Sequence, residues 1–113
     1  MSVAKTTIGT TSNAITIANN NTQILQFYLH NQDNSSHTVD IYFVANGDSI
    51  DTTNYTNRIY KGKSIASGDT LTIDNEVWLF NASDKIYVIV DNNPAGGSTT
   101  AVVCSYIYKV LTF

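Results

Sequence analysis

Apolar and polar residues alternate with a period of two along much of this 113-residue chain, and this pattern restricts its fold more than any other feature. A period of two places alternate side chains on opposite faces of a β-strand, whereas a helix requires a period of about 3.6 residues. The clearest example is His37–Ala45, in which Val39, Ile41 and Phe43 share one predicted face. Glu76 is the only glutamate, and other strong helix formers are scarce. The chain is therefore predicted to be all-β.

Turn residues divide the chain into short alternating segments. The expected strands are Ala14–Ala18, Ile24–Asn31, His37–Ala45, Asp69–Asp74, Ile86–Val90 and Thr100–Leu111. Arg58–Lys61 and Val77–Phe80 are open between a strand and a turn. The stretch up to about Asn13 is rich in Thr and Ser, and it fits either a loose N-terminal arm or an edge strand. Asp91–Thr99 contains the only proline and two adjacent glycines, so it is predicted to be a hairpin loop.

About eight short strands in a chain of this length predict one antiparallel β-sandwich domain over residues 1–113, with a jelly-roll-like arrangement. A chain of this size can bury a core without disulfides or metal. Cys104 is the only cysteine, and it lies in an apolar alternating run. It is therefore predicted to be a buried, unreactive thiol.

In two of the expected strands, the pattern predicts which residues share a face. In Ile24–Asn31, the residues Leu25, Phe27 and Leu29 are predicted to face the core together. Thr100–Leu111 carries apolar residues on both of its faces. One face is assigned to the core, and the other is predicted to be covered by another element or another subunit.

Charge argues against a nucleic-acid partner, because the net charge is −3 and a phosphate backbone requires a basic stripe. The only local basic group is Arg58, Lys61 and Lys63, and it is predicted to be a solvated loop face. No apolar run follows Met1, and no stretch is long enough for a membrane span. The chain is therefore expected to lack a signal peptide and to be made in a cytoplasm without membrane association.

No residue pattern predicts catalysis. His30 and His37 flank one turn, and Asp33 or Asp40 could add a further ligand. This set falls short of the usual four zinc ligands, so surface histidines are expected in place of a metal site. Motifs for a serine nucleophile or a phosphate-binding loop are missing from the sequence, and Cys104 is expected to be buried. We therefore expect a protein that is not an enzyme and that holds no cofactor or metal.

Aromatic residues give the strongest indication of a contact function. The chain has seven Tyr, four Phe and one Trp. Tyrosine is enriched at interfaces because its ring offers apolar area and its hydroxyl offers a hydrogen bond. The candidate interface residues are Tyr28, Tyr42, Tyr55, Tyr60, Trp78, Tyr106 and Tyr108. Three of these, Tyr55, Tyr60 and Trp78, are also candidates for a platform on which a sugar could stack.

The order of several short motifs resembles a known class of proteins. In chain order they are Asn31 at a strand end, the alternating run Val39–Val44, Gly47, Asn57–Tyr60, Ser64–Thr70, Leu71–Asp74 and Ser83–Ile86. This order resembles the small β-sandwich structural proteins of tailed bacteriophages, over more than half of the chain. The chain departs from that pattern at Ser83-Asp84, where Gly-Asp is usual.

The resemblance implies a virion protein made in the cytoplasm of a bacterial host. Its implied role is capsid decoration, in which the protein cements or coats the particle by protein–protein contacts. A tail adaptor or spike component and a carbohydrate-binding module for receptor recognition are the alternatives. The implied partners are capsid or tail proteins and further copies of the chain, with a trimer as one such assembly. The resemblance supplies no catalytic residues.

Overall fold

The computed structural model describes residues 2–8, 13–16, 21–76, 78–91 and 101–111, with the backbone alone for 13–16. This part of the chain is all-β and contains nine strands and no helix. The strands are β1 (Ser2–Ile8), β2 (Asn13–Thr16), β3 (Thr22–Asn31), β4 (His37–Val44), β5 (Arg58–Ile65), β6 (Thr70–Ile73), β7 (Trp78–Phe80), β8 (Lys85–Val90) and β9 (Val102–Val110).

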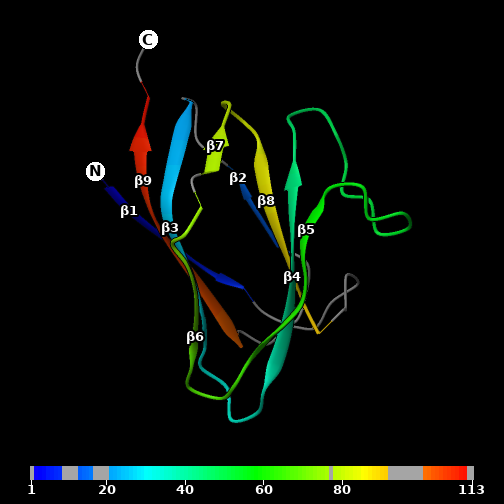
Figure 1. Cartoon of the computed structure of the whole chain (residues 1–113), viewed down its shortest axis with the longest axis vertical. Coiled ribbons are helices and arrows are strands. Elements are labelled where there is room, and N and C mark those ends of the chain that lie inside the picture. The colour runs from blue at the N-terminus through cyan, green and yellow to red at the C-terminus, as the bar shows by residue number, and fades with distance from the viewer. Residues whose placement is uncertain (1, 9–12, 17–20, 77, 92–100, 112–113) are drawn as a thin grey trace.

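The strands form two antiparallel sheets that lie against each other (Figure 1). The five-stranded sheet has the order β1-β9-β3-β6, and β7 also pairs with β3. The four-stranded sheet has the order β2-β8-β4-β5. Consecutive strands therefore usually belong to different sheets, and the chain crosses repeatedly from one layer to the other.

The core lies between the two sheets, on the faces that the alternation predicts. Phe27 and Leu29 of β3 face Val39 and Ile41 of β4 within one buried cluster. Cys104 of β9 belongs to the same cluster and is fully buried, as predicted. Burial raises the pKa of its thiol far above the ordinary value, so the thiolate that reacts or binds metals does not form near neutral pH.

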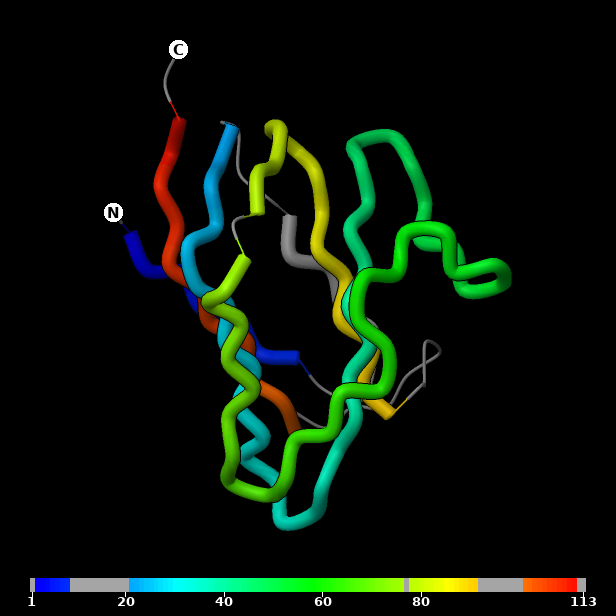
Figure 2. Tube along the Cα trace, viewed as in Figure 1, coloured from blue at the N-terminus to red at the C-terminus, as the bar shows by residue number. Residues whose placement is uncertain are grey.

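A second, smaller cluster covers the outer face of the four-stranded sheet. Tyr42, Val44 and Ile89 are buried there, and Ile50 and Tyr87 pack against them. Ile50 belongs to the long segment between β4 and β5. Figure 2 shows this segment (green) at the right of the molecule, beside both strands. β4 and β8 are therefore buried on both faces, which the sequence pattern suggested only for the last strand.

A β-bulge in β3 changes one predicted face. The pairing with β9 shifts between Ile24 and Gln26, so Leu25 is the extra residue. Ile24 is thereby brought onto the core side with Phe27, whereas Leu25 is only half buried. The prediction that Leu25 shares the core face with Phe27 and Leu29 was wrong, because a strict period of two holds only for an unbulged strand.

The strand partners settle several segments that the sequence left open. Ser2–Ile8 pairs with β9 as an edge strand and is not a loose arm over that length. Arg58–Lys61 is part of β5, and Trp78–Phe80 forms β7. The predicted hairpin after Asp91 was wrong, because β8 and β9 lie in different sheets. Residues 92–100 themselves, with Val77, are outside the described residues.

Candidate functional site

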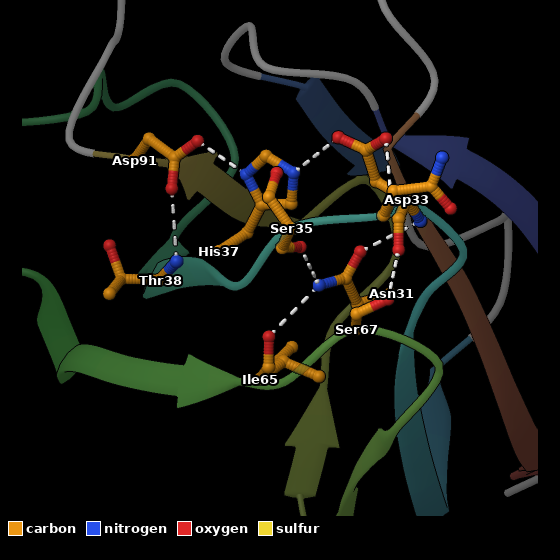
Figure 3. A network of polar contacts seen from close by, with 9 residues as sticks. Asn31, Asp33, Ser35, His37, Thr38, Ile65, Ser67 and Asp91 are labelled. Carbon is orange, nitrogen blue, oxygen red and sulfur yellow. Dashed lines mark hydrogen bonds and ion pairs between the residues drawn. The ribbon is translucent and has the colours of Figure 1, made fainter.

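A buried asparagine ties the two sheets together at one end of the molecule (Figure 3). The side chain of Asn31, at the end of β3, is fully buried. Its Nδ2 donates to the carbonyls of Ser35, at 2.8 Å, and Ile65, at 2.9 Å. Its Oδ1 accepts from the backbone N–H of Asp33 at 2.9 Å. Asn31 therefore fixes the β3–β4 loop and the end of β5, which belongs to the opposite sheet.

His37 occupies the neighbouring position and lies between two carboxylates (Figure 3). Its Nε2 is 2.8 Å from Asp33 Oδ2, and its Nδ1 is 2.5 Å from Asp91 Oδ2. Asp91 also accepts a hydrogen bond from the backbone N–H of Thr38 at 3.0 Å. Both ring nitrogens face acceptors, so the arrangement favours the doubly protonated, charged imidazolium.

The pKa values of this group follow from its geometry. Hydrogen bonds to Asp33 and then to Asp91 raise the pKa of His37 above its usual 6.5, although burial opposes this. The hydrogen bond from His37 lowers the pKa of Asp33. Each ring nitrogen of His37 contacts a carboxylate. His37, Asp33 and Asp91 therefore have a structural role, and they hold the start of β4 to the end of β8.

The two histidines do not form the hairpin pair that was considered as a metal site. β3 and β4 lie in different sheets, and His30 contacts the Thr70 hydroxyl at 3.0 Å on the outer face of the five-stranded sheet. Asp40 lies on β4, three residues after His37, and its carboxylate contacts Gly62 and Arg58. Across the described ranges, no three His, Cys, Asp or Glu side chains are arranged to hold a metal ion. In the same ranges, no helix has the length and apolar character to span a bilayer.

Glu76 joins the sheets at a second place. Its carboxylate accepts hydrogen bonds from the Tyr60 hydroxyl of β5 and from Trp78 Nε1 of β7, the latter at 3.2 Å. The bond to Glu76 raises the pKa of Tyr60 to about 12. The only glutamate of the chain therefore connects the four-stranded sheet to the five-stranded sheet, and its neighbours Tyr60 and Trp78 have structural partners.

An open pocket of about 360 Å³ lies beside β4 and β5, on the side away from the core. Its lining residues are Thr38, Asp40, Tyr55, Arg58, Lys61 and Gly62. The pocket coincides with a bulge, because Val39 pairs with Lys63 whereas Ile41 pairs with Tyr60. The bulge leaves Lys61 and Gly62 opposite a single residue of β4.

The bulge also fixes the carboxylate of the pocket. Gly62 has a φ of +59°, a left-handed conformation that favours glycine. Its N–H donates to Asp40 Oδ1 at 2.6 Å. Arg58 lies with its guanidinium carbon 4.0 Å from the ring centroid of Tyr55, and its Nη1 is 3.8 Å from Asp40 Oδ2. The pocket therefore combines the carboxylate of Asp40, which Gly62 holds, with the guanidinium of Arg58 and the half-exposed ring of Tyr55 on which it stacks.

Asp51 organises the loop that carries Tyr55. Its Oδ1 accepts from the N–H groups of Thr53 and Asn54, at 3.0 and 2.9 Å, and its Oδ2 accepts from the Thr56 hydroxyl at 2.9 Å. The backbone hydrogen bond from Asn54 is the largest cause that lowers the pKa of Asp51 to about 2. These bonds close the loop on both sides of Tyr55, whose φ is +58°.

Replacement of Asp51 by Ala is expected to loosen this loop while the two sheets stay intact. The folded-state pKa lies below the unfolded value of 3.8, so the Asp51 contribution is present above about pH 4 and is lost as the pH falls toward 2. The protection factors of the Thr53 and Asn54 amides, which compare each exchange rate with that of an unfolded chain at the same pH, should therefore fall in the variant, and in wild type at low pH. Asp48→Ala, in the same loop, is the matched control; an equal fall in both variants would contradict the role of Asp51.

The outer face of the five-stranded sheet has no covering layer among the described residues. Val3 of β1 is 75% exposed and Leu79 of β7 is 67% exposed. Val3 pairs directly with Ile107 of β9, whose side chain is half buried. The described strands of this sheet contain two lysines, Lys5 and Lys109, and no Asp or Glu. Neither lysine forms an ion pair with a described residue.

The seven aromatic candidates are dispersed over the molecule. Tyr42 and Trp78 are buried, so they offer no contact surface in this fold. Tyr106 and Tyr108 are half buried and pack against the core. The remaining three are accessible in part: Tyr28 on the outer face of the five-stranded sheet, Tyr60 at the Glu76 contact and Tyr55 in the pocket.

Sequence reasoning missed the most connected polar residues. Asp91 and His37 are 54 positions apart, so no local pattern links them. Asn31 was singled out only as a strand end. Arg58 and Lys61 were expected on a solvated loop, but they lie in β5 and line the pocket. The glycine at position 62 was the one available signal for the bulge. Comparison of the chain with protein-family models, curated proteins and solved structures finds no match.

Proposed function

We propose that this protein is a non-enzymatic structural protein of a tailed-phage virion, and that it decorates the capsid through the outer face of its five-stranded sheet. We further propose that the two sheets constitute a jelly roll. The strand orders β1-β9-β3-β6 and β2-β8-β4-β5, with repeated crossing between the layers, support this topology. Jelly rolls are frequent in viral capsid proteins and lectins. Because one fold can host many functions, the proposal also requires a surface on this protein that could contact a capsid subunit.

The observation that carries the proposal is the composition of that outer face. Val3 and Leu79 are the two most exposed large apolar side chains among the described residues, and both lie on this face. Val3 and Ile107 are adjacent in register, so they form one apolar area. Lys5 projects from the same face of β1 as Val3, two residues further along the strand.

Charge defines the partner more closely. The chain carries a net charge of −3, yet the described strands of this sheet carry two lysines and no carboxylate. The complementary surface is therefore apolar at its centre and acidic at its rim. A second copy would place lysines against lysines across a symmetric contact between these faces, so the occupant we propose is an acidic, apolar patch on a capsid subunit. Assembly of the decoration protein into a homo-oligomer, with a trimer as one form, would use other edges.

Replacement of Val3 by Glu is expected to abolish incorporation into particles. A carboxylate at this position is placed in the apolar centre of the contact, next to the acidic rim of the partner, and its cost to folding is small because the side chain is exposed. Particles purified by density gradient from producing cells should contain at least about tenfold fewer copies of the variant, a difference equivalent to about 1.4 kcal/mol. Quantitative blotting of the particles gives this ratio.

The matched control is Ala66→Glu, which adds the same charge at an exposed turn beyond β5. It should incorporate like wild type. Wild-type chain missing from purified particles would refute the virion role itself, and equal loss in both variants would refute the assigned face. A cryo-EM map of the particle separates capsid decoration from a tail adaptor or spike, because the two place the density on different lattices.

A further inference from the structure

The polar pocket beside β4 and β5 lies on the other sheet and takes no part in the proposed capsid contact. Thr38, Asp40 and Tyr42 alternate with the core residues of β4, so Asp40 points away from the core. Its side chain is nevertheless only 8% exposed, because the β5 bulge and Arg58 cover it. A carboxylate is costly to bury, and it is retained here in a fixed orientation at a pocket wall. We propose that this pocket binds a carboxylated sugar residue, of the hexuronic-acid or sialic-acid type.

The charge of the pocket selects an anion. Its lining contains two cations, Arg58 and Lys61, and one carboxylate, Asp40. Lys61 is exposed and forms no ion pair with any described residue. Arg58 Nη1 is 3.8 Å from Asp40 Oδ2, which exceeds hydrogen-bond distance, and the guanidinium also hydrogen-bonds the Tyr42 hydroxyl. A guanidinium has five N–H groups, so these two contacts leave N–H groups for a ligand. A carboxylate that accepts from Arg58 and lies near Lys61 balances the excess positive charge.

The remaining groups select a polyol. Tyr55 is 40% exposed and presents an aromatic surface at the mouth of the pocket, against which the C–H face of a sugar ring can pack. Thr38 and the second oxygen of Asp40 can bond to hydroxyl groups. A small anion such as acetate would use the cations and leave these groups unused.

Size and geometry are consistent with one sugar unit. Pockets that hold small molecules usually measure about 300–1,000 Å³, and this one, at about 360 Å³, is at the lower end. An added Cβ on Gly62 would meet nothing within 4 Å, so the pocket floor is open at that point. Tyr55 has a left-handed backbone conformation, and the hydrogen bonds of Asp51 hold the loop that carries it. The position of the Tyr55 ring at the pocket is therefore fixed before a ligand binds.

The test is an NMR titration of the whole chain with D-glucuronate and with N-acetylneuraminate. Glucose is the uncharged control, and acetate is the anion without a sugar ring. We expect saturable shifts around Asp40 and Gly62 with at least one acidic sugar, at a dissociation constant on the order of 1 mM. Glucose and acetate should bind at least about tenfold more weakly. Equal binding of glucose, equal binding of acetate, or no saturable shift with either acidic sugar would overturn the proposal.

Two pairs of variants locate the site. Lys61→Glu should weaken binding at least about tenfold, whereas Lys63→Glu makes the same charge change on the same strand outside the pocket and should bind like wild type. Tyr55→Leu should weaken binding about tenfold, and Tyr55→Phe should retain it because the ring remains. Equal effects within either pair would refute the site. The result is independent of capsid incorporation, since all three positions lie away from the five-stranded sheet.

Discussion

Replacement of Asn31 by Ala is expected to lower the free energy of unfolding by about 3 kcal/mol. The substitution leaves the carbonyls of Ile65 and Ser35 and the N–H of Asp33 without their present partner. Of these three bonds, the one to Ile65 is buried, so water cannot replace it without cost. A loss of this size is a large part of the stability of a small domain, which is typically about 5–15 kcal/mol.

Urea unfolding, followed by tryptophan fluorescence, measures this change. Trp78 is buried between the sheets, so its emission should report the global transition. The transition midpoint should fall by about 1–3 M, since m-values of small proteins are about 1–3 kcal/mol per molar urea. Asn34→Ala, three residues further along in the exposed turn, is the matched control and should change stability by less than about 0.5 kcal/mol. A similar small change for Asn31→Ala would mean that the sheets do not depend on this cross-link.

The Asn31→Asp variant distinguishes the loss of the two hydrogen bonds that Nδ2 donates from the loss of side-chain volume. The carboxylate keeps the shape of the side chain but turns the Nδ2 donor into an acceptor that faces two carbonyls. The variant should therefore be destabilised at neutral pH at least as strongly as Asn31→Ala, and it should recover part of the loss as the pH falls and the carboxylate becomes protonated. Equal stability of Asn31→Asp and wild type at neutral pH would contradict the assigned donor bonds.

Local sequence pattern predicted the strands well and their partners poorly. β4, β6 and β8 lie close to their expected positions, because each face of a strand repeats at every second residue. The pairing of strands depends on contacts between distant residues, so the segment after Asp91 was assigned to a hairpin although β8 and β9 lie in different sheets. The apolar residues on the outer face of the last strand were visible in the sequence, and the described residues provide no layer over them.

The polar sites were harder to predict, for a physical reason. The pocket exists because of two irregularities: the bulge at Lys61 and Gly62, and the left-handed residue Tyr55. The bulge depends on a contact between two strands, the Gly62 bond to Asp40, and the Tyr55 conformation depends on the loop that Asp51 closes. Neither follows from residue periodicity. Similarly, burial of Tyr42 required the segment between β4 and β5 to fold back over the sheet.

Stability is expected to decrease as the pH rises above neutrality, because His37 loses its charge between Asp33 and Asp91. The folded-state pKa of His37 is raised above the unfolded value of 6.5. The stabilisation is therefore complete below about pH 6.5 and is lost as the pH rises through the folded-state pKa. The slope reaches at most about 1.4 kcal/mol per pH unit, the limit for one proton. Above the folded-state pKa, one carboxylate must face a neutral ring that has only one N–H to donate.

Urea unfolding of wild type and His37→Gln at pH values from about 6 to 8.5 tests this expectation. Wild type should lose stability across the range, whereas His37→Gln should be less stable at pH 6 and should show a flatter profile. The difference between the two profiles removes contributions from other groups, among them the Cys104 thiol, whose pKa burial raises in the folded state. His30→Gln is the control, because that ring contacts the Thr70 hydroxyl on the exposed face and no carboxylate; it should retain the wild-type slope. If His37→Gln kept the same slope as wild type, the two carboxylates would not be holding a charged imidazolium, and the start of β4 would be held to the end of β8 by the strand pairing and by the two hydrogen bonds between Thr38 and Asp91.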